Sequence, residues 1–327
     1  NLAATSVLGG GPPFSLKLDG TDDFMVVDDD SSITPTAALT LSAWVNLDTQ
    51  HGATGWLNPD GSPSEHHSQA VIGCVNVGGW GIFIEYAGTG WPNPDGNDDH
   101  SEAVLGCVNV GGWGIFIEYA GTANNPTTKI KSLIRVTDTG SGSGGYLTPI
   151  WGGKTSSTAG SALHEIKDFS GWIHIAVTYA SGVARLYING SNDLNVGAVD
   201  TSAAQTVDSG VTSNPIVYRS NTALMIGADA IAAGNNSSAN THLKGGLIDD
   251  VAVWDAAIDS DGITVIYNSG KAGLNLLAAS GNYDNQNDLQ AWWKFEEGSG
   301  TSVADSSSNS NTGTLVNSPS FSDNTSE

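Results

Sequence analysis

Aspartates gather in three short stretches of this sequence, and carboxylate oxygens are ligands that calcium prefers. The first stretch contains Asp19, Asp22 and Asp23, the second is residues 28–30, and the third contains Asp249. The first and third stretches adjoin strand-like segments at opposite ends of a long β-rich region, where they could lie side by side. We therefore expect the three aspartates of the first stretch to share a structural calcium ion with Asp249. The alternative is that these aspartates bond the backbone of turns.

Four aromatic residues stand near turn-like segments and are candidates for binding glycans. They are Trp56, Trp91, Tyr146 and Trp151. An aromatic ring has a large apolar face that can stack on the C–H groups of a sugar when the ring is exposed on a loop. The alternative is that each ring folds back over a sheet edge and is buried there.

Cleaving a glycosidic bond usually takes a pair of carboxyl groups that face one cleft. The pair Glu165 and Asp168 and the pair Glu296 and Glu297 would each point to opposite faces of a strand. The sequence also contains no GxSxG motif, no HExxH motif and no phosphate-binding loop. We therefore expect a protein that is not an enzyme.

The histidines and cysteines give no clear metal site. His174 lies within an apolar strand-like run, which predicts a core-packed or hydrogen-bonded histidine, whereas His66 and His67 lie in a polar loop. The two cysteines, Cys74 and Cys107, belong to no CxxC motif and to no Cys/His cluster, so no zinc site is expected.

The overall charge limits the classes of partner. The chain of 327 residues has 34 acidic and 11 basic residues and a formal net charge of −23. Nucleic-acid binding needs a basic patch, which 11 scattered bases do not provide. An anionic membrane surface would repel the chain, and no apolar run reaches the roughly 18 residues of a membrane span. The 42 glycines indicate many turns between short strands.

Short runs of alternating apolar and polar residues predict antiparallel strands with one face on a core. The predicted inward residues are Leu41, Ala43, Val45, Ile173, Ile175 and Val177, with Trp44 buried as well. One short helix is expected over DSDGITVIYNSG, because Asp259 or Ser260 can cap its start and Gly270 suits its end.

The stretch GCVNVGGWGIFIEYAGT occurs twice without change, at residues 73–89 and 106–122, 33 positions apart. Each copy follows a Pro-Asp-Gly segment and reads as strand, glycine turn and strand. The repeat is therefore predicted to be a β-hairpin with its leading loop, in the units 55–89 and 90–122. An extra hairpin would extend a sheet edge or project as an arm. A recent tandem duplication and an error in sequence assembly both stay open as explanations.

Six motifs, in order, resemble the laminin-G-like branch of the concanavalin A-like lectin/glucanase superfamily. They are LKLDGTDDFMVV, ALTLSAWVNL, GWIHIAVTY, ARLYING, LMIG and GGLIDDVAVWDAAIDSDGITVIYNSG. The resemblance implies an all-β, two-sheet antiparallel jelly-roll sandwich, here with a duplicated hairpin and one short helix. Members often hold a structural calcium ion, and those that cleave glycans carry Glu-x-Asp-x-x-Glu, which this sequence lacks. Such domains occur in secreted bacterial proteins, matrix proteins and structural proteins of tailed phages.

The resemblance also defines the expected organisation, with an N-terminal tail over 1–13, the sandwich over 14–279 and a C-terminal segment over 280–327. The motif AWWKFEEGSG commonly opens such a domain but comes last here. It can complete its own sandwich or that of a neighbouring molecule.

We expect a non-enzymatic structural module on a virion surface or outside the cell, as a homo-oligomer or part of a larger viral or filament assembly. The alternative is a lectin-like module that binds cell-surface glycans; a glycan-cleaving enzyme is the third possibility.

Overall fold

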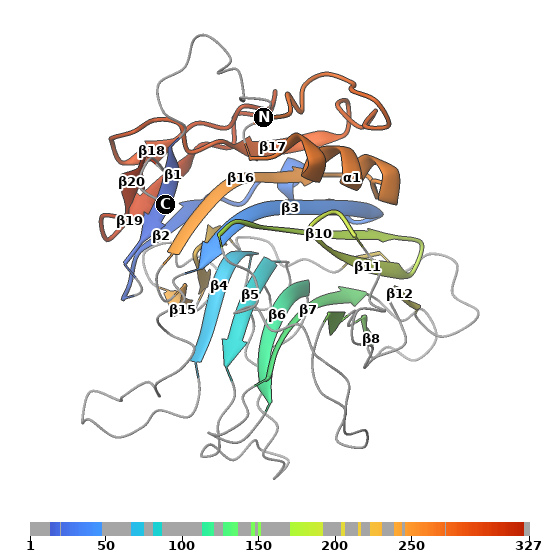
Figure 1. The fold of residues 1–327 in the computed structure, drawn as a ribbon, viewed down its shortest axis with the longest axis horizontal. Coiled ribbons are helices and arrows are strands. Elements are labelled where there is room, and N and C mark those ends of the chain that lie inside the picture. The colour runs from blue at the N-terminus through green and yellow to red at the C-terminus, as the bar shows by residue number, and fades with distance from the viewer. Residues whose placement is uncertain are drawn as a thin grey trace, which may run out of the picture.

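The computed structural model describes residues 14–19, 21–47, 67–74, 81–86, 113–120, 127–136, 145–147, 150–151, 171–191, 204–206, 215–216, 223–230, 239–243, 246–271 and 273–323. For the strands between residues 67 and 151 this description covers the backbone. The predicted all-β fold is confirmed, with antiparallel sheets in layers and a single α-helix within the described residues (Figure 1).

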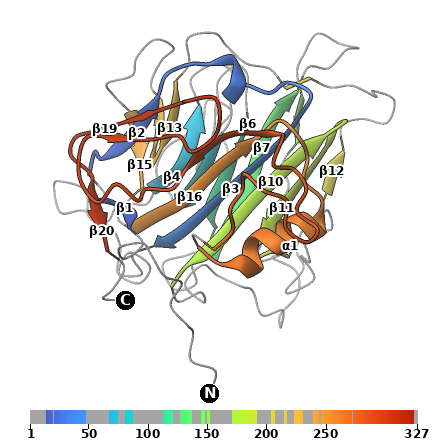
Figure 2. The same ribbon diagram turned by 90° about the horizontal axis from the view of Figure 1, so that it is seen from above.

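The larger sheet, sheet A, has eight described strands. In spatial order they are β12 (Ala204–Thr206), β11 (Val183–Ile188), β10 (Ile173–Ala180), β3 (Ala38–Leu47), β16 (Gly246–Trp254), β1 (Ser15–Leu18) and β20 (Ser320–Ser322), with β17 (Leu289–Trp293) also paired to β16. Strands β1 and β17 pair with successive halves of β16, and the register of β16 against β3 shifts between Asp249 and Ala252. The long central strands run side by side in Figure 2.

The second sheet, sheet B, has six described strands. Their order is β18 (Ser302–Val303), β19 (Gly313–Val316), β2 (Phe24–Val27), β13 (Leu224–Ile226), β4 (His67–Cys74) and β5 (Gly81–Tyr86). A further sheet contains β6 (Trp113–Ala120), β7 (Thr127–Val136), β8 (Gly145–Leu147) and β9 (Ile150–Trp151), and β14 (Ala228–Ala230) pairs with β15 (Ala239–His242). A 3-10 turn, η1 (Ser31–Ile33), follows β2.

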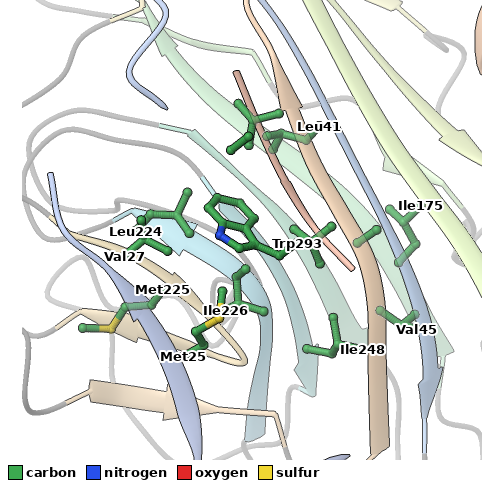
Figure 3. Packing of buried hydrophobic residues seen from close by; sticks show 14 of the residues in the cluster. Met25, Val27, Leu41, Val45, Ile175, Leu224, Met225, Ile226, Ile248 and Trp293 are labelled. Atoms are coloured by element: carbon green, nitrogen blue, oxygen red, sulfur yellow. The ribbon is translucent and has the colours of Figure 1, made fainter. Parts of the chain in front are cut away.

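The main core lies between sheets A and B. All six residues that the alternation predicted to point inward are at most 1% exposed and belong to this core. Sheet B contributes Phe24, Met25, Leu224 and Met225, and Figure 3 shows these strands facing Val45 and Ile175 across the core. Period-two alternation therefore predicted the correct face of β3 and β10.

A second apolar cluster covers the other face of sheet A. Helix α1 (Ser260–Ser269) lies over this face, where Ile263 and Ile266 pack near Trp254 and Tyr187 (Figure 2). The predicted caps are confirmed: Asp259 accepts two backbone hydrogen bonds at the N-terminus, and Gly270 ends the helix at a φ of 75°. Because helix and sheet share this cluster, residues between them are buried although they face away from the main core.

The two copies of the repeat have different strand partners. In the first copy β4 and β5 form the expected hairpin, with Gly73 opposite Gly81. In the second copy β6 pairs with β7, which follows it in the chain. The predicted first strand of the second copy lies outside the described residues.

The C-terminal segment pairs within its own chain. Strand β17 pairs with β16, β19 with β2 and β20 with β1, so the segment adds strands to both sheets. Trp293 and Phe295 are fully buried in the main core. The segment therefore completes its own sandwich, which is the first of the two possibilities above; assembly with further copies stays a prediction.

Candidate functional site

The aspartates of the first acidic stretch lie in the turn between β1 and β2. One carboxylate oxygen from each of Asp19, Asp22 and Asp23 lies within 4.8 Å of the others. Oxygens that share a calcium ion at 2.3–2.6 Å are at most about 5 Å apart, so this spacing fits one cation. Asp19 and Asp22 are exposed, whereas Asp23 is buried.

The same carboxylates also bond the backbone of the turn, as the alternative interpretation expected. Asp23 accepts a hydrogen bond of 3.2 Å from the backbone N–H of Asp19, and Asp19 accepts one of 2.7 Å from that of Thr21. The Asn317 side chain donates to the Asp22 carbonyl at 2.8 Å. The turn is thus shaped by its own carboxylates and tied to the residue after β19, and the two interpretations are compatible.

The electrostatics of this turn favour a cation. Burial raises the pKa of Asp23, and the neighbouring charges of Asp19 and Asp22 raise it further, although the backbone hydrogen bond from Asp19 lowers it. A raised pKa means that the negative charge is disfavoured in this place. A divalent cation would offset both the burial and the mutual repulsion.

Asp249 does not join this cluster. It is fully buried in β16, where its Oδ2 atom accepts hydrogen bonds from Ser15 at 2.8 Å and from the Lys271 ammonium at 2.7 Å. Ser15 begins β1, and Asp19 comes after its end. Ser15 and Asp19 are four positions apart, and a strand rises about 3.3 Å per residue, so the two residues lie roughly 13 Å apart. The predicted four-aspartate ligand set is therefore split, with Asp249 in an ion pair instead.

This buried ion pair joins several elements. Lys271 follows helix α1, its side chain is 13% exposed, and its ammonium lies 4.7 Å from the centre of the Trp172 ring. Burial raises the pKa of Asp249 to about 7, and the Asp250 charge adds to the effect, whereas Lys271 and Ser15 lower it. A buried ion pair loses much of its Coulombic gain to desolvation, so the network fixes geometry more than it adds stability.

The register shift in β16 positions Asp250. Its φ is 45°, in the left-handed region, and its carboxylate accepts a hydrogen bond of 3.0 Å from the Trp292 indole. Asp250 also lines a small pocket between sheet A and the segment around α1. The other lining residues are Ser42, Trp44, Ile266, Gly270, Leu274 and Leu276. The pocket is far smaller than a sugar site, which needs hundreds of Å³.

His174 is the buried histidine that the strand pattern predicted. One ring nitrogen, Nε2, lies 2.7 Å from the Ser42 hydroxyl, and the ring centre lies 5.1 Å from that of Trp44. Trp44, only 7% exposed as expected, stacks on Tyr267 of α1. Burial lowers the pKa of His174 to about 3, so the ring is neutral and acts as a packed hydrogen-bonding group.

The structure describes two of the four candidate glycan-binding residues. Tyr146 lies in β8 opposite Arg135, and Trp151 lies in β9 opposite Ile130. Both strands therefore pair with β7. Trp56 and Trp91 lie outside the described residues. The structure therefore places two of the four candidates in strands that each pair with β7 and leaves their role as a prediction.

Sequence reasoning missed Lys271 and Trp292 as partners of the third acidic stretch. Both contacts join residues at least 22 positions apart through the fold, and neither residue belongs to a motif around Asp249 or Asp250. The nearest available signal was Gly270, which ends α1 and places the next residue beside the sheet.

A family model described as the concanavalin A-like lectin/glucanases superfamily (Laminin_G_3) matches residues 89–264, more than half of the chain. The chain belongs to this superfamily. The match begins after β5, so it contains the second copy of the repeat and not the first. None of the curated proteins matches the sequence.

Several solved structures are similar to this superfamily member. A candidate carbohydrate-binding protein from Bacteroides ovatus has a TM-score of 0.46 and 12% identity over 95% of this chain, which spans 60% of that protein. A heptameric SAP-like pentraxin from Limulus polyphemus has a TM-score of 0.33 and 11% identity, covering 79% of this chain and 83% of its own. Domain 4 of an extracellular arabinanase from Geobacillus stearothermophilus, solved with arabinotriose, has a TM-score of 0.32 and 13% identity, covering 77% and 75%.

Proposed function

We propose that this protein is a glycan-binding, lectin-like module without hydrolytic activity. The observation that carries the proposal is membership of a superfamily of lectins and glucanases in a chain whose sequence lacks Glu-x-Asp-x-x-Glu. The lectin alternative is therefore preferred to the virion or filament subunit that the sequence first suggested.

The arrangement of carboxylates supports the absence of hydrolysis. Two glycosidase carboxyl groups lie about 5–9.5 Å apart across a cleft that admits the sugar. The acidic cluster of the β1–β2 turn bonds its own backbone instead, and Asp249 is fully buried against Lys271. Within the described residues these groups therefore favour structural roles.

We further propose that Asp19, Asp22 and Asp23 hold a structural calcium ion. Three carboxylates supply only part of the six to eight oxygens that calcium takes, so backbone carbonyls and water complete the set. Few protein ligands and two exposed aspartates imply weak affinity, which suits extracellular calcium concentrations. An extracellular or surface location follows from this proposal. Among the described residues no helix is long and apolar enough to cross a membrane.

A glycan array probed with the whole chain in calcium tests the proposal. We expect a defined set of glycans to bind, and binding to fall about tenfold or more in Trp151→Ala, Tyr146→Ala or the double variant Trp56→Ala/Trp91→Ala. The control is Leu277→Ala, which alters an exposed apolar side chain and should leave binding unchanged.

Two results would overturn the proposal. If no glycan binds while the protein is folded, the lectin function is wrong. If a bound oligosaccharide is shortened during incubation, the protein is an enzyme.

A further inference from the structure

Two identical strands lie next to each other in this fold. Residues 81–86 of β5 and residues 114–119 of β6 both read GIFIEY, at equivalent places in the repeat. Figure 1 shows β4, β5, β6 and β7 in that order, and β5 is a close neighbour of β6.

Among the strands that the structure describes, β5 and β6 are each paired along one edge. β5 is paired with β4, where Ile84 lies opposite Gln69, and β6 is paired with β7, where Ile117 lies opposite Ile130. Within the described residues no ladder joins β5 to β6, and each ends its own sheet. The sheet is therefore divided between two strands of the same sequence.

One strand of this sequence would be enough to join the two sheets. A strand has two edges, so a single GIFIEY strand can pair with β4 on one side and with β7 on the other.

We infer that β5 and β6 are interchangeable, and that one copy of the repeat is a 33-residue insertion that divides an otherwise continuous sheet. Because β5 and β6 present the same residues to β7, the strand that pairs with β7 is determined by the length of the segment that connects it to β7. The connection to β7 is residues 121–126 from β6 and residues 87–126 from β5. Loop closure scales as the 3/2 power of length, which favours β6 by roughly 17-fold. Pairing of β7 with β5 is therefore a minor state of the same molecule.

The first test removes residues 74–106. Gly73 is then followed by Cys107, and the junction reads as the natural sequence because both copies continue identically. We expect a folded monomer with a β-rich circular dichroism spectrum and cooperative melting like that of the full chain. Loss of cooperative melting would contradict the inference.

The second test keeps the full chain and breaks the strands with proline, which removes a ladder hydrogen bond. Ile84→Pro and Ile117→Pro alter equivalent positions, and each single variant should fold because the other copy replaces it. The double variant should not fold. Val177→Pro in β10, which has no second copy, is the control for an irreplaceable strand.

The inference is overturned if Ile117→Pro is as unstable as the double variant. It is equally overturned if the double variant folds as well as the single ones, because neither strand would then be needed.

Discussion

Asp249 in β16 and His174 in β10 are both buried on the face of sheet A that points away from the main core. Burial shifts their pKa values in opposite directions. Burial disfavours a charge, so it raises the pKa of an acid and lowers that of a base. The pKa of Asp249 rises from 3.8 to about 7, and that of His174 falls from 6.5 to about 3. Between pH 3.8 and 6.5 the native state therefore binds more protons than the unfolded state at Asp249, and fewer at His174.

The variant Asp249→Asn removes the contribution of Asp249 to the pH dependence of stability and leaves that of His174. Asp249 adds stability as the pH falls from about 7 toward 3.8, because it takes up a proton there only in the native state. Without this gain, the free energy of unfolding should decrease on acidification, by up to about 1.4 kcal/mol for each pH unit below 6.5. Urea unfolding at pH 7 and pH 5 measures the change. An equal change in both proteins would show that Asp249 is ionised alike in the two states.

The variant His174→Gln removes the contribution of His174 to the pH dependence of stability and leaves that of Asp249. Below pH 6.5 the unfolded state binds a proton at this histidine and the native state does not, so His174 lowers the stability on acidification and opposes the gain from Asp249. Removing this loss should make the variant relatively more stable at pH 5 than at pH 7. Glutamine keeps a donor that can reach Ser42, which limits the structural change. An equal pH dependence of the free energy of unfolding in the variant and in the natural protein would contradict a neutral buried ring.

Calcium should stabilise the turn between β1 and β2. A ligand present at 100 times its dissociation constant adds about 2.7 kcal/mol, which is several degrees of melting temperature for a chain of this size. We expect calcium to raise the melting temperature of the natural protein and excess chelator to reverse it. Asp19→Asn/Asp22→Asn should abolish the response, whereas Asp284→Asn, which changes an exposed aspartate elsewhere, should retain it. An unchanged melt in calcium, with no metal by elemental analysis, would reject the site.

At the level of residues, sequence reasoning found the carboxylates but not all of their partners. Asp19, Asp22 and Asp23 lie within five positions, so a single turn gathers them, and this grouping could be predicted. The partner of Asp249 could not, because Lys271 approaches only after α1 packs on sheet A. Spacing along the sequence therefore predicts clusters within one turn, whereas contacts between distant residues depend on tertiary packing.

Among the elements, helix α1 depends on its N-cap. Asp259 accepts hydrogen bonds from the backbone N–H groups of Asp261 and Gly262 at 3.0 and 2.8 Å. Asp259→Ala should therefore lower the free energy of unfolding by about 1 kcal/mol, and Asp259→Asn should restore most of it because asparagine is as good a cap. Chemical denaturation of the three proteins measures both differences. If asparagine is as poor as alanine, the cap does not contribute through its hydrogen bonds.

Elements with strong local signals were predictable, and strand partners were less so. The capping residues and the alternation in β3 and β10 identified these elements and their buried faces. The repeat marks the limit of this reasoning, because β5 and β6 have the same residues and different partners. Identical sequences cannot encode that difference, which comes from their places in the chain.

For the whole molecule, the C-terminal segment should be essential to the monomer. Trp293 and Phe295 fill the main core, and β17, β19 and β20 pair with three other parts of the chain. Removing residues 291–327 should therefore unfold the protein, and Trp293→Ala alone should cost about 3–5 kcal/mol. Circular dichroism and size-exclusion chromatography distinguish the outcomes. A truncated chain that stays folded but loses its oligomers would show that the segment acts between subunits.

The antiparallel pairing of β1 with β20 also determines how the molecule responds to tension. Ser15 lies opposite Ser322, so Phe14 and residue 323 leave the ladder at the same end. A force that pulls these two positions apart acts on one hydrogen bond at a time, as in opening a zipper, instead of loading all of them together in shear. Sheet A therefore yields first at this corner, at low force, while β3, β10 and β16 carry little of the load.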